Sequence, residues 1–222
     1  MKLKNRRQKA IAPLAALLVL ASGGAHAAIT ALLTTPGSGT LRNDFTGSVG
    51  STFTSISAST VINRLGFYDA GGDGLAEAHT VGLYLWDGSA YQLQTSATIS
   101  AGTGTTLEGG YRWVSIADYT LSDLNSQYYL VMASTTNGGD SWGDYQTFPT
   151  NLIGQMDARG WYSTGGVTAT FTPDGGVTNG FGGLGSNYFA GNIGYVPEPS
   201  AAALAGFAAL GLVLRRRRSS NR

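Results

Sequence analysis

The sequence contains no cysteine, and between Ala28 and Tyr195 it contains no lysine and a single histidine, His79. The lack of cysteine excludes disulfides, thiolate nucleophiles, iron–sulfur clusters and cysteine-based zinc sites. One histidine cannot supply the several imidazole ligands of a typical catalytic zinc site within one chain. No Gly-x-Ser-x-Gly motif occurs, so no nucleophile is evident for His79 to activate. These absences favour a protein that is not an enzyme.

Positive charge is also scarce in this central interval. It holds four arginines against twelve acidic residues, hence a formal charge of −8. Binding to phosphate backbones needs clustered lysine and arginine. We therefore expect no nucleic-acid partner.

Between Ala28 and Tyr195 no helical periodicity of apolar residues is found. The interval contains instead short runs rich in β-branched and aromatic residues. Turn residues such as Asp87-Gly88 separate these runs, and Asp-Gly between two such runs predicts a hairpin. The pattern predicts an all-β chain, folded as one antiparallel β-sandwich or jelly-roll domain over residues 28–195. Within the glycine-rich part from Asn137 to Gly194, we expect long loops and one or two late strands. The predicted strands are Ser51–Ser57, Thr60–Tyr68, Val81–Trp86, Tyr91–Ile99, Tyr111–Ile116, Gln127–Ala133 and the late strands Tyr188–Ala190 and Asn192–Tyr195.

Both ends of the chain differ from this domain in composition. Residues 1–27 begin with five basic side chains, continue with an apolar run from Ile11 to Ala21 and finish at Ala25-His26-Ala27. This order is typical of a secretory signal peptide that signal peptidase removes after Ala27. The mature protein is expected to begin near Ala28.

Residues 196–222 begin with Val196-Pro197-Glu198-Pro199, continue with an apolar run from Ala201 to Leu214, and then reach Arg215, Arg216, Arg217 and Arg218. As a helix, the apolar run would span about 21 Å, less than the roughly 30 Å of a bilayer core. Snorkelling arginines and local thinning of the bilayer can narrow that difference, and a cationic flank is a stop-transfer signal. We expect a short transmembrane helix with its arginines on the cytoplasmic side.

The Val196–Pro199 motif, the apolar run and the arginine cluster follow one another in an order that resembles the PEP-CTERM sorting signal of Gram-negative bacteria. The resemblance implies that an exosortase-like membrane protease with a cysteine nucleophile cuts near Pro197 to Pro199. It also implies transient anchoring in the inner membrane, followed by release or transfer to the cell surface, commonly in exopolysaccharide or biofilm settings.

A second resemblance covers roughly residues 56–134. Leu65-Gly66-Phe67-Tyr68-Asp69, Gly72-Asp73-Gly74-Leu75, the run from His79 to Tyr84 and Tyr111-Arg112-Trp113-Val114 follow one another in a recognisable order. They resemble a β-sandwich domain of unknown function found in secreted bacterial proteins, many of which carry the same tail. This resemblance bears on the fold and implies no activity.

Two sets of residues are candidate binding sites. Asp69, Asp73 and Glu77 lie around glycines, as the oxygen ligands of a structural calcium ion can, although the spacing lacks the final glutamate of an EF-hand. The alternative is a long turn in which the aspartates bond backbone amides. Trp142 and Trp161 lie in glycine-rich sequence and could cover the apolar faces of sugars, or could simply be part of the core.

Three functions remain open on these grounds. The first is an exported, non-catalytic surface or matrix protein associated with extracellular polysaccharide. The second is a carbohydrate-binding module, with or without structural calcium, that uses loop aromatics. The third is a secreted glycoside hydrolase or lyase, which needs two carboxylates facing each other about 5–10 Å apart.

Overall fold

The computed structural model describes residues 28–33, 39–55, 60–121, 128–145, 154–168, 170–172, 179–184 and 187–195. Every regular element in this part of the chain is a β-strand, and every strand pairing is antiparallel. The predicted all-β, antiparallel class is therefore confirmed. The strands are β1 Thr30–Ala31, β2 Thr40–Arg42, β3 Gly47–Ser55, β4 Val61–Tyr68, β5 His79–Trp86, β6 Tyr91–Ile99, β7 Thr106–Glu108, β8 Tyr111–Thr120, β9 Tyr128–Thr135, β10 Trp142–Tyr145, β11 Gly154–Ser163, β12 Thr170–Phe171, β13 Asn179–Leu184, β14 Asn187–Phe189 and β15 Gly191–Tyr195.

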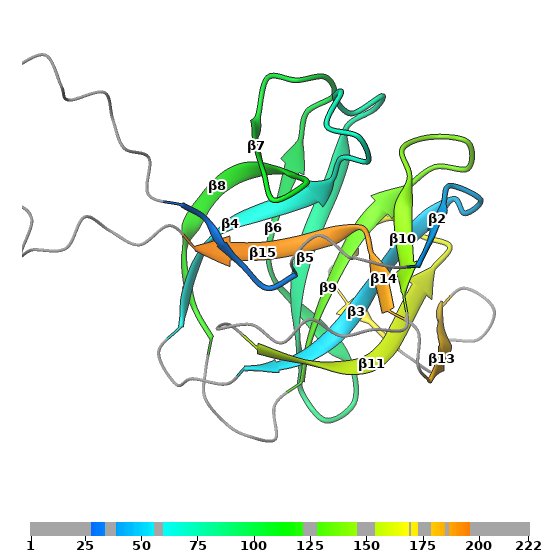
Figure 1. The fold of residues 1–222 in the computed structure, drawn as a ribbon. Helices are drawn as coiled ribbons and strands as arrows, with labels where there is room; N and C mark the ends of the chain where they lie inside the picture. Colours follow the sequence, from blue (N-terminus) through cyan, green and yellow to red (C-terminus); the bar gives the residue numbers. More distant parts are fainter. Residues whose placement is uncertain are drawn as a thin grey trace, which may run out of the picture.

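The strands form three sheets that curl around a shared interior (Figure 1). The largest has seven strands in the order β12-β6-β5-β9-β3-β11-β13. A five-stranded sheet in the order β1-β15-β4-β8-β7 crosses in front of it in Figure 1. A small sheet of β14, β10 and β2 lies beside β3 and β11. The arrangement is sandwich-like, with the main core between the two larger sheets.

The seven-stranded sheet buries side chains on both of its faces. In β9, Tyr129 and Val131 belong to the main core, whereas the alternate residues Leu130 and Met132 belong to a second cluster with Tyr84. Successive side chains of a strand point to opposite faces. A strand buried on both faces needs a continuous apolar run, and the Tyr-Tyr-Leu-Val-Met-Ala sequence of β9 is such a run.

Most of the predicted strands are present at nearly their predicted positions. The hairpin predicted at Asp87-Gly88 is confirmed, because β5 and β6 pair on either side of it and Asp87 Oδ1 accepts hydrogen bonds from the amides of Ser89 and Ala90. Gly88 has φ of 101°, a left-handed conformation that favours glycine. The glycine-rich region departs from expectation, because it contributes β10, β11, β12 and β13 in addition to the late strands β14 and β15.

Both predicted targeting segments, residues 1–27 and 196–222, lie outside the described residues. These include Ala25 and Ala27, the Val196–Pro199 motif and the arginines from Arg215 to Arg218. Within the described ranges, no helix has the length and apolar character needed to cross a bilayer.

Candidate functional site

A depression among the described residues lies between the small sheet and the neighbouring strands β3 and β11. Its volume is about 190 Å³. We call it the aromatic hollow and define it by its six lining residues, Arg42, Phe45, Val49, Trp142, Tyr162 and Tyr188. They come from β2, β3, β10, β11, β14 and the β2–β3 connection, so five strands and one connection converge on the site.

Four aromatic rings form the walls of the aromatic hollow. Trp142 and Tyr188 meet edge to face, with ring centroids 5.1 Å apart, and Phe45 and Tyr162 do the same at 5.7 Å. Trp142 and Tyr188 are buried, whereas Phe45 and Tyr162 are partly exposed. The accessible aromatic surface of the hollow therefore comes mainly from Phe45 and Tyr162. Burial raises the pKa of Tyr188, so its hydroxyl stays neutral at physiological pH.

The charged wall of the aromatic hollow is an arginine between two aspartates. Arg42 donates from Nε and Nη2 to both oxygens of Asp44, at 3.0 and 3.1 Å, and from Nη1 to Asp144 Oδ2 at 2.9 Å. Its guanidinium lies 4.9 Å from the centroid of the Trp142 ring, within cation–π range. The hydrogen bond with Asp44 raises the pKa of Arg42 and lowers that of Asp44. The three groups together carry a formal charge of −1.

Local sequence explains why these groups meet. Trp142 pairs with Arg42 and Asp144 pairs with Tyr188 in the antiparallel register of the small sheet. Alternation along β10 then places Trp142 and Asp144 on the same face. A short sheet with a Trp-Gly-Asp sequence thereby presents an aromatic ring and a carboxylate side by side.

The structure separates the two tryptophans predicted to bind carbohydrate. Trp142 is 1% exposed and contributes to the wall of the aromatic hollow. Trp161 is 8% exposed and packs in the second cluster, with Tyr91 and Phe171, on the other face of the seven-stranded sheet. Its neighbour Tyr162 lines the aromatic hollow, and Trp161 does not.

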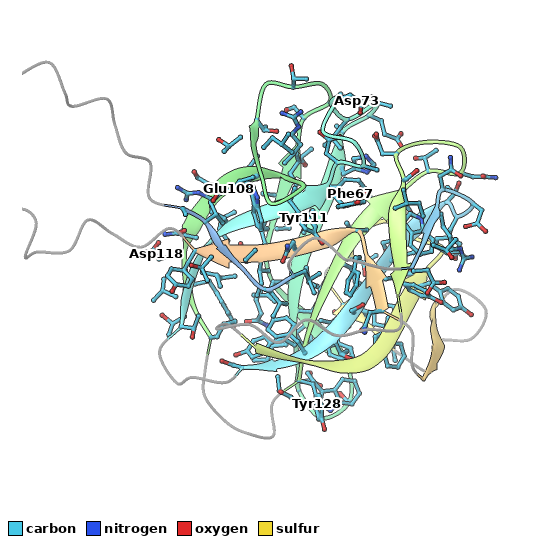
Figure 2. The ribbon with its side chains drawn as sticks, viewed as in Figure 1. Phe67, Asp73, Glu108, Tyr111, Asp118 and Tyr128 are labelled. Atoms are coloured by element: carbon cyan, nitrogen blue, oxygen red, sulfur yellow. The ribbon has the colours of Figure 1, made fainter. Side chains whose placement is uncertain are left out.

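The three predicted calcium ligands do not come together. Asp69 is buried and forms an ion pair with Arg112, with Nε and Oδ2 2.7 Å apart. Asp73 lies at the exposed tip of the β4–β5 loop (Figure 2), and Glu77 lies against Gly139. No group of three metal-ligating side chains occurs in the described part of the chain. The guanidinium of Arg112 also opposes a dication at Asp69, because like charges repel strongly where water is excluded.

Arg112 instead organises the turns at this end of the domain. Besides the Asp69 carboxylate, it donates to the backbone carbonyls of Gly72, Thr103 and Thr105 at 3.0–3.2 Å. Asp69 also accepts from the amide of Gly74. The sequence offered a long turn as the alternative to a calcium site. The guanidinium group of Arg112 holds that turn.

His79 is 1% exposed, and its ring stacks on Phe67 with centroids 3.6 Å apart. Its Nδ1 lies 2.8 Å from the carbonyl oxygen of Ser134, and its Nε2 lies 2.9 Å from Asp140 Oδ2. Neither nitrogen faces a nucleophilic hydroxyl. The hydrogen-bonding role of His79 is therefore structural, and the sequence could not identify Asp140 as its partner.

The chain was compared with family models, curated protein sequences and solved structures, and none of the three comparisons finds a match.

Proposed function

We propose that this chain is an exported extracellular protein, processed by an exosortase-like protease, whose β-domain binds an uncharged saccharide without cleaving it. The export part of the proposal is supported by the composition of residues 1–27 and 196–222. The binding part is supported by the aromatic hollow.

The observation that carries the binding proposal is a depression walled by four aromatic rings with hydrogen-bonding groups at one side. Ligand sites are mostly apolar, with a few placed polar groups that set orientation. A sugar ring matches this chemistry, because its C–H faces pack on aromatic rings and its hydroxyls bond to carboxylates and guanidinium groups. At about 190 Å³ the aromatic hollow is smaller than the roughly 300–1,000 Å³ of sites for drug-sized ligands, which suits one ring of a polymer.

Charge favours an uncharged ligand. Asp44 and Asp144 already neutralise Arg42, and the central domain has a formal charge of −8. An acidic polysaccharide would have to displace a two-point contact to Asp44 and approach a negative surface. Neutral extracellular polysaccharides meet neither obstacle.

The same geometry argues against glycoside hydrolysis at this place. A glycosidase needs one carboxyl group whose pKa is raised, so that it can protonate the leaving group. Arg42 has the opposite effect on Asp44, because its hydrogen bond lowers the pKa of that carboxyl. The Asp44 carboxylate therefore suits binding better than proton donation.

Binding is tested by isothermal titration of the exported protein with cellohexaose, chitohexaose and oligogalacturonate. We expect a neutral hexasaccharide to bind, and Tyr162→Ala to weaken that binding by about tenfold or more, since a stacked ring contributes roughly 1–2 kcal/mol. Tyr119→Ala is the matched control, because Tyr119 is also a partly exposed strand tyrosine but lies on β8 in the other sheet. Absence of binding to both neutral sugars, or equal effects of the two substitutions, would refute the proposal. Preferential binding of oligogalacturonate would refute the charge argument.

A further inference from the structure

The loop between β9 and β10 is held by one carboxylate, that of Asp140. Oδ1 accepts from the amide of Ala76 at 2.9 Å, and Oδ2 accepts from the amide of Glu77 at 3.1 Å and contacts Nε2 of His79 at 2.9 Å. These contacts join the β9–β10 loop to the β4–β5 loop, which lies at the same end of the domain (Figure 1).

His79 makes this attachment rigid. The Ser134 carbonyl can only accept a hydrogen bond, so Nδ1 of His79 donates to it. The stacking on Phe67, a core residue, leaves the ring little freedom to turn. Asp140 therefore contacts a side chain that is itself fixed at two other places, its Nδ1 atom and its ring face.

The same β9–β10 loop is hydrogen-bonded to the β2–β3 connection, which follows Arg42 in the charged wall of the aromatic hollow. The amide of Gly138 donates to the carbonyl of Asn43 at 2.6 Å, and the amide of Asn137 donates to Thr46 Oγ1 at 2.9 Å. Asn43 lies between Arg42 and Asp44 in the sequence, and Thr46 follows Phe45. The loop thus contacts the segment on both sides of Asp44 and Phe45, at a backbone carbonyl next to Arg42 and at the side chain of Thr46.

The β10 residues at the aromatic hollow are attached to the same loop through the chain itself. Trp142 follows Asp140 by two residues and Asp144 follows it by four. A movement of Asp140 would consequently displace both the aromatic wall and the β2–β3 connection.

We infer that the contact between buried His79 and partly exposed Asp140 is the positioning device of the aromatic hollow: it fixes the β9–β10 loop, and through that loop the separation of Arg42 and Phe45 from Trp142. His79 and Asp140 act through the loop and touch no ligand. The part of this inference that concerns affinity rests on the proposed saccharide function, whereas the part that concerns loop attachment does not.

The test uses Asp140→Asn, which keeps the shape of the side chain but removes its charge and one acceptor oxygen. The readouts are amide hydrogen exchange at Gly138, which reports the contact with Asn43, and titration with cellohexaose and chitohexaose. We expect exchange at Gly138 to accelerate by about tenfold and the affinity for the binding hexasaccharide to fall by about tenfold.

Two controls separate positioning from general destabilisation. Asp87→Asn removes a chemically similar carboxylate, which accepts from the amides of Ser89 and Ala90 and from Gln92 in the β5–β6 turn. Ile62→Val removes one methylene group from the main core and lowers the overall stability of the domain. Neither is expected to change exchange at Gly138 or sugar affinity at a temperature where all variants are folded.

Each outcome has a distinct meaning. Faster exchange at Gly138 in Asp140→Asn alone, with weaker sugar binding, supports the inference. If Asp140→Asn leaves Gly138 protected, or if Ile62→Val gives the same changes, the inference is overturned. If the wild-type protein binds neither sugar, the proposed function fails while the exchange measurement still decides whether Asp140 positions the loop.

Discussion

Arg112 and Asp69 form an ion pair inside the domain, with Nε and Oδ2 2.7 Å apart and side-chain exposures of 5% and 2%. The pair joins β8 to the turn after β4, and through its other hydrogen bonds Arg112 also holds the carbonyls of Thr103 and Thr105. Two groups that would each be costly to bury alone are thereby buried together.

Removing either Arg112 or Asp69 should reveal the free-energy cost of burying the other charge alone. Arg112→Ala leaves Asp69 as a buried charge, and breaking such a pair typically costs about 3–5 kcal/mol. We expect chemical denaturation to show a loss of that order. Asp44→Asn alters an ion pair at the surface, where 36% and 60% of the two side chains are exposed, and should cost less than about 1 kcal/mol. Similar losses for the two variants would contradict the assignment of Arg112 as the organiser of these turns.

Acid should release the loop that Asp140 holds. Burial by itself would raise the pKa of Asp140, but hydrogen bonds from Ala76, His79 and Glu77 outweigh it and lower the pKa. The unfolded chain therefore takes up this proton at a higher pH, near the ordinary value of about 3.9. The stabilisation is complete above that value and is lost as the pH falls through the lower folded-state pKa.

The measurement is the unfolding free energy of wild type and Asp140→Asn between pH 7 and pH 2. We expect the difference between them to shrink as the pH falls below about 4. Asp118→Asn, which removes an exposed carboxylate on β8 (Figure 2), controls for the loss of one negative charge and should follow the wild-type curve. A constant difference across the whole pH range would show that the Asp140 carboxylate does not contribute in this way.

Close packing around Gly66 gives a third prediction. A Cβ at this position would lie 2.7 Å from the indole ring of Trp113 on β8, which is closer than real contacts allow. Gly66→Ala must displace that buried ring, and overpacking of this kind costs about 1–3 kcal/mol. Gly104→Ala places its methyl group in open space and should change the thermal midpoint little. Equal midpoints for both variants would mean that β4 and β8 are less tightly packed than described.

Export and processing can be tested on residues outside the described structure. Intact mass of the protein from the medium and cell surface of its native host should show loss of residues up to about Ala27 and from about Pro199 onward. Replacing Arg215 to Arg218 with neutral residues should impair retention and processing, because the cationic flank would no longer stop transfer across the membrane. Retention of Ala201 to Arg222 in the wild-type protein would indicate a permanent anchor, and normal maturation of the variant would contradict the sorting proposal.

The strands were predictable where local sequence decides them. Runs such as Tyr128–Ala133 are apolar on both faces, and the Asp87-Gly88 turn encodes its own conformation, so β9 and the β5–β6 hairpin lie where the sequence placed them. The strands between Asn137 and Leu184 were missed because glycine there masks the pattern. In β11 and β13 the stability comes from pairing with neighbouring strands, which local composition does not reveal.

The aromatic hollow was predictable only in part. Trp142 was a candidate, but Trp161 and Tyr162 could be told apart only once residues 154–163 were recognised as a strand, since neighbouring side chains then point to opposite faces. These two long-range side-chain contacts could not be predicted from the sequence, because Asp140 lies 61 residues from His79 and Asp69 lies 43 residues from Arg112. Such contacts depend on the order of strands in the sheets.

The pairing of β1 with β15 has a mechanical consequence. Thr30 is opposite Tyr195, so the chain enters and leaves the domain at one point, on the edge of the five-stranded sheet. Any pull transmitted through the residues after Tyr195 acts along β15, which is bonded to β1 on one side and to β4 on the other. Load in that direction is shared by several ladder hydrogen bonds at once and does not open them one by one. A domain tethered at its C-terminus would thus resist drag on whatever its far end holds.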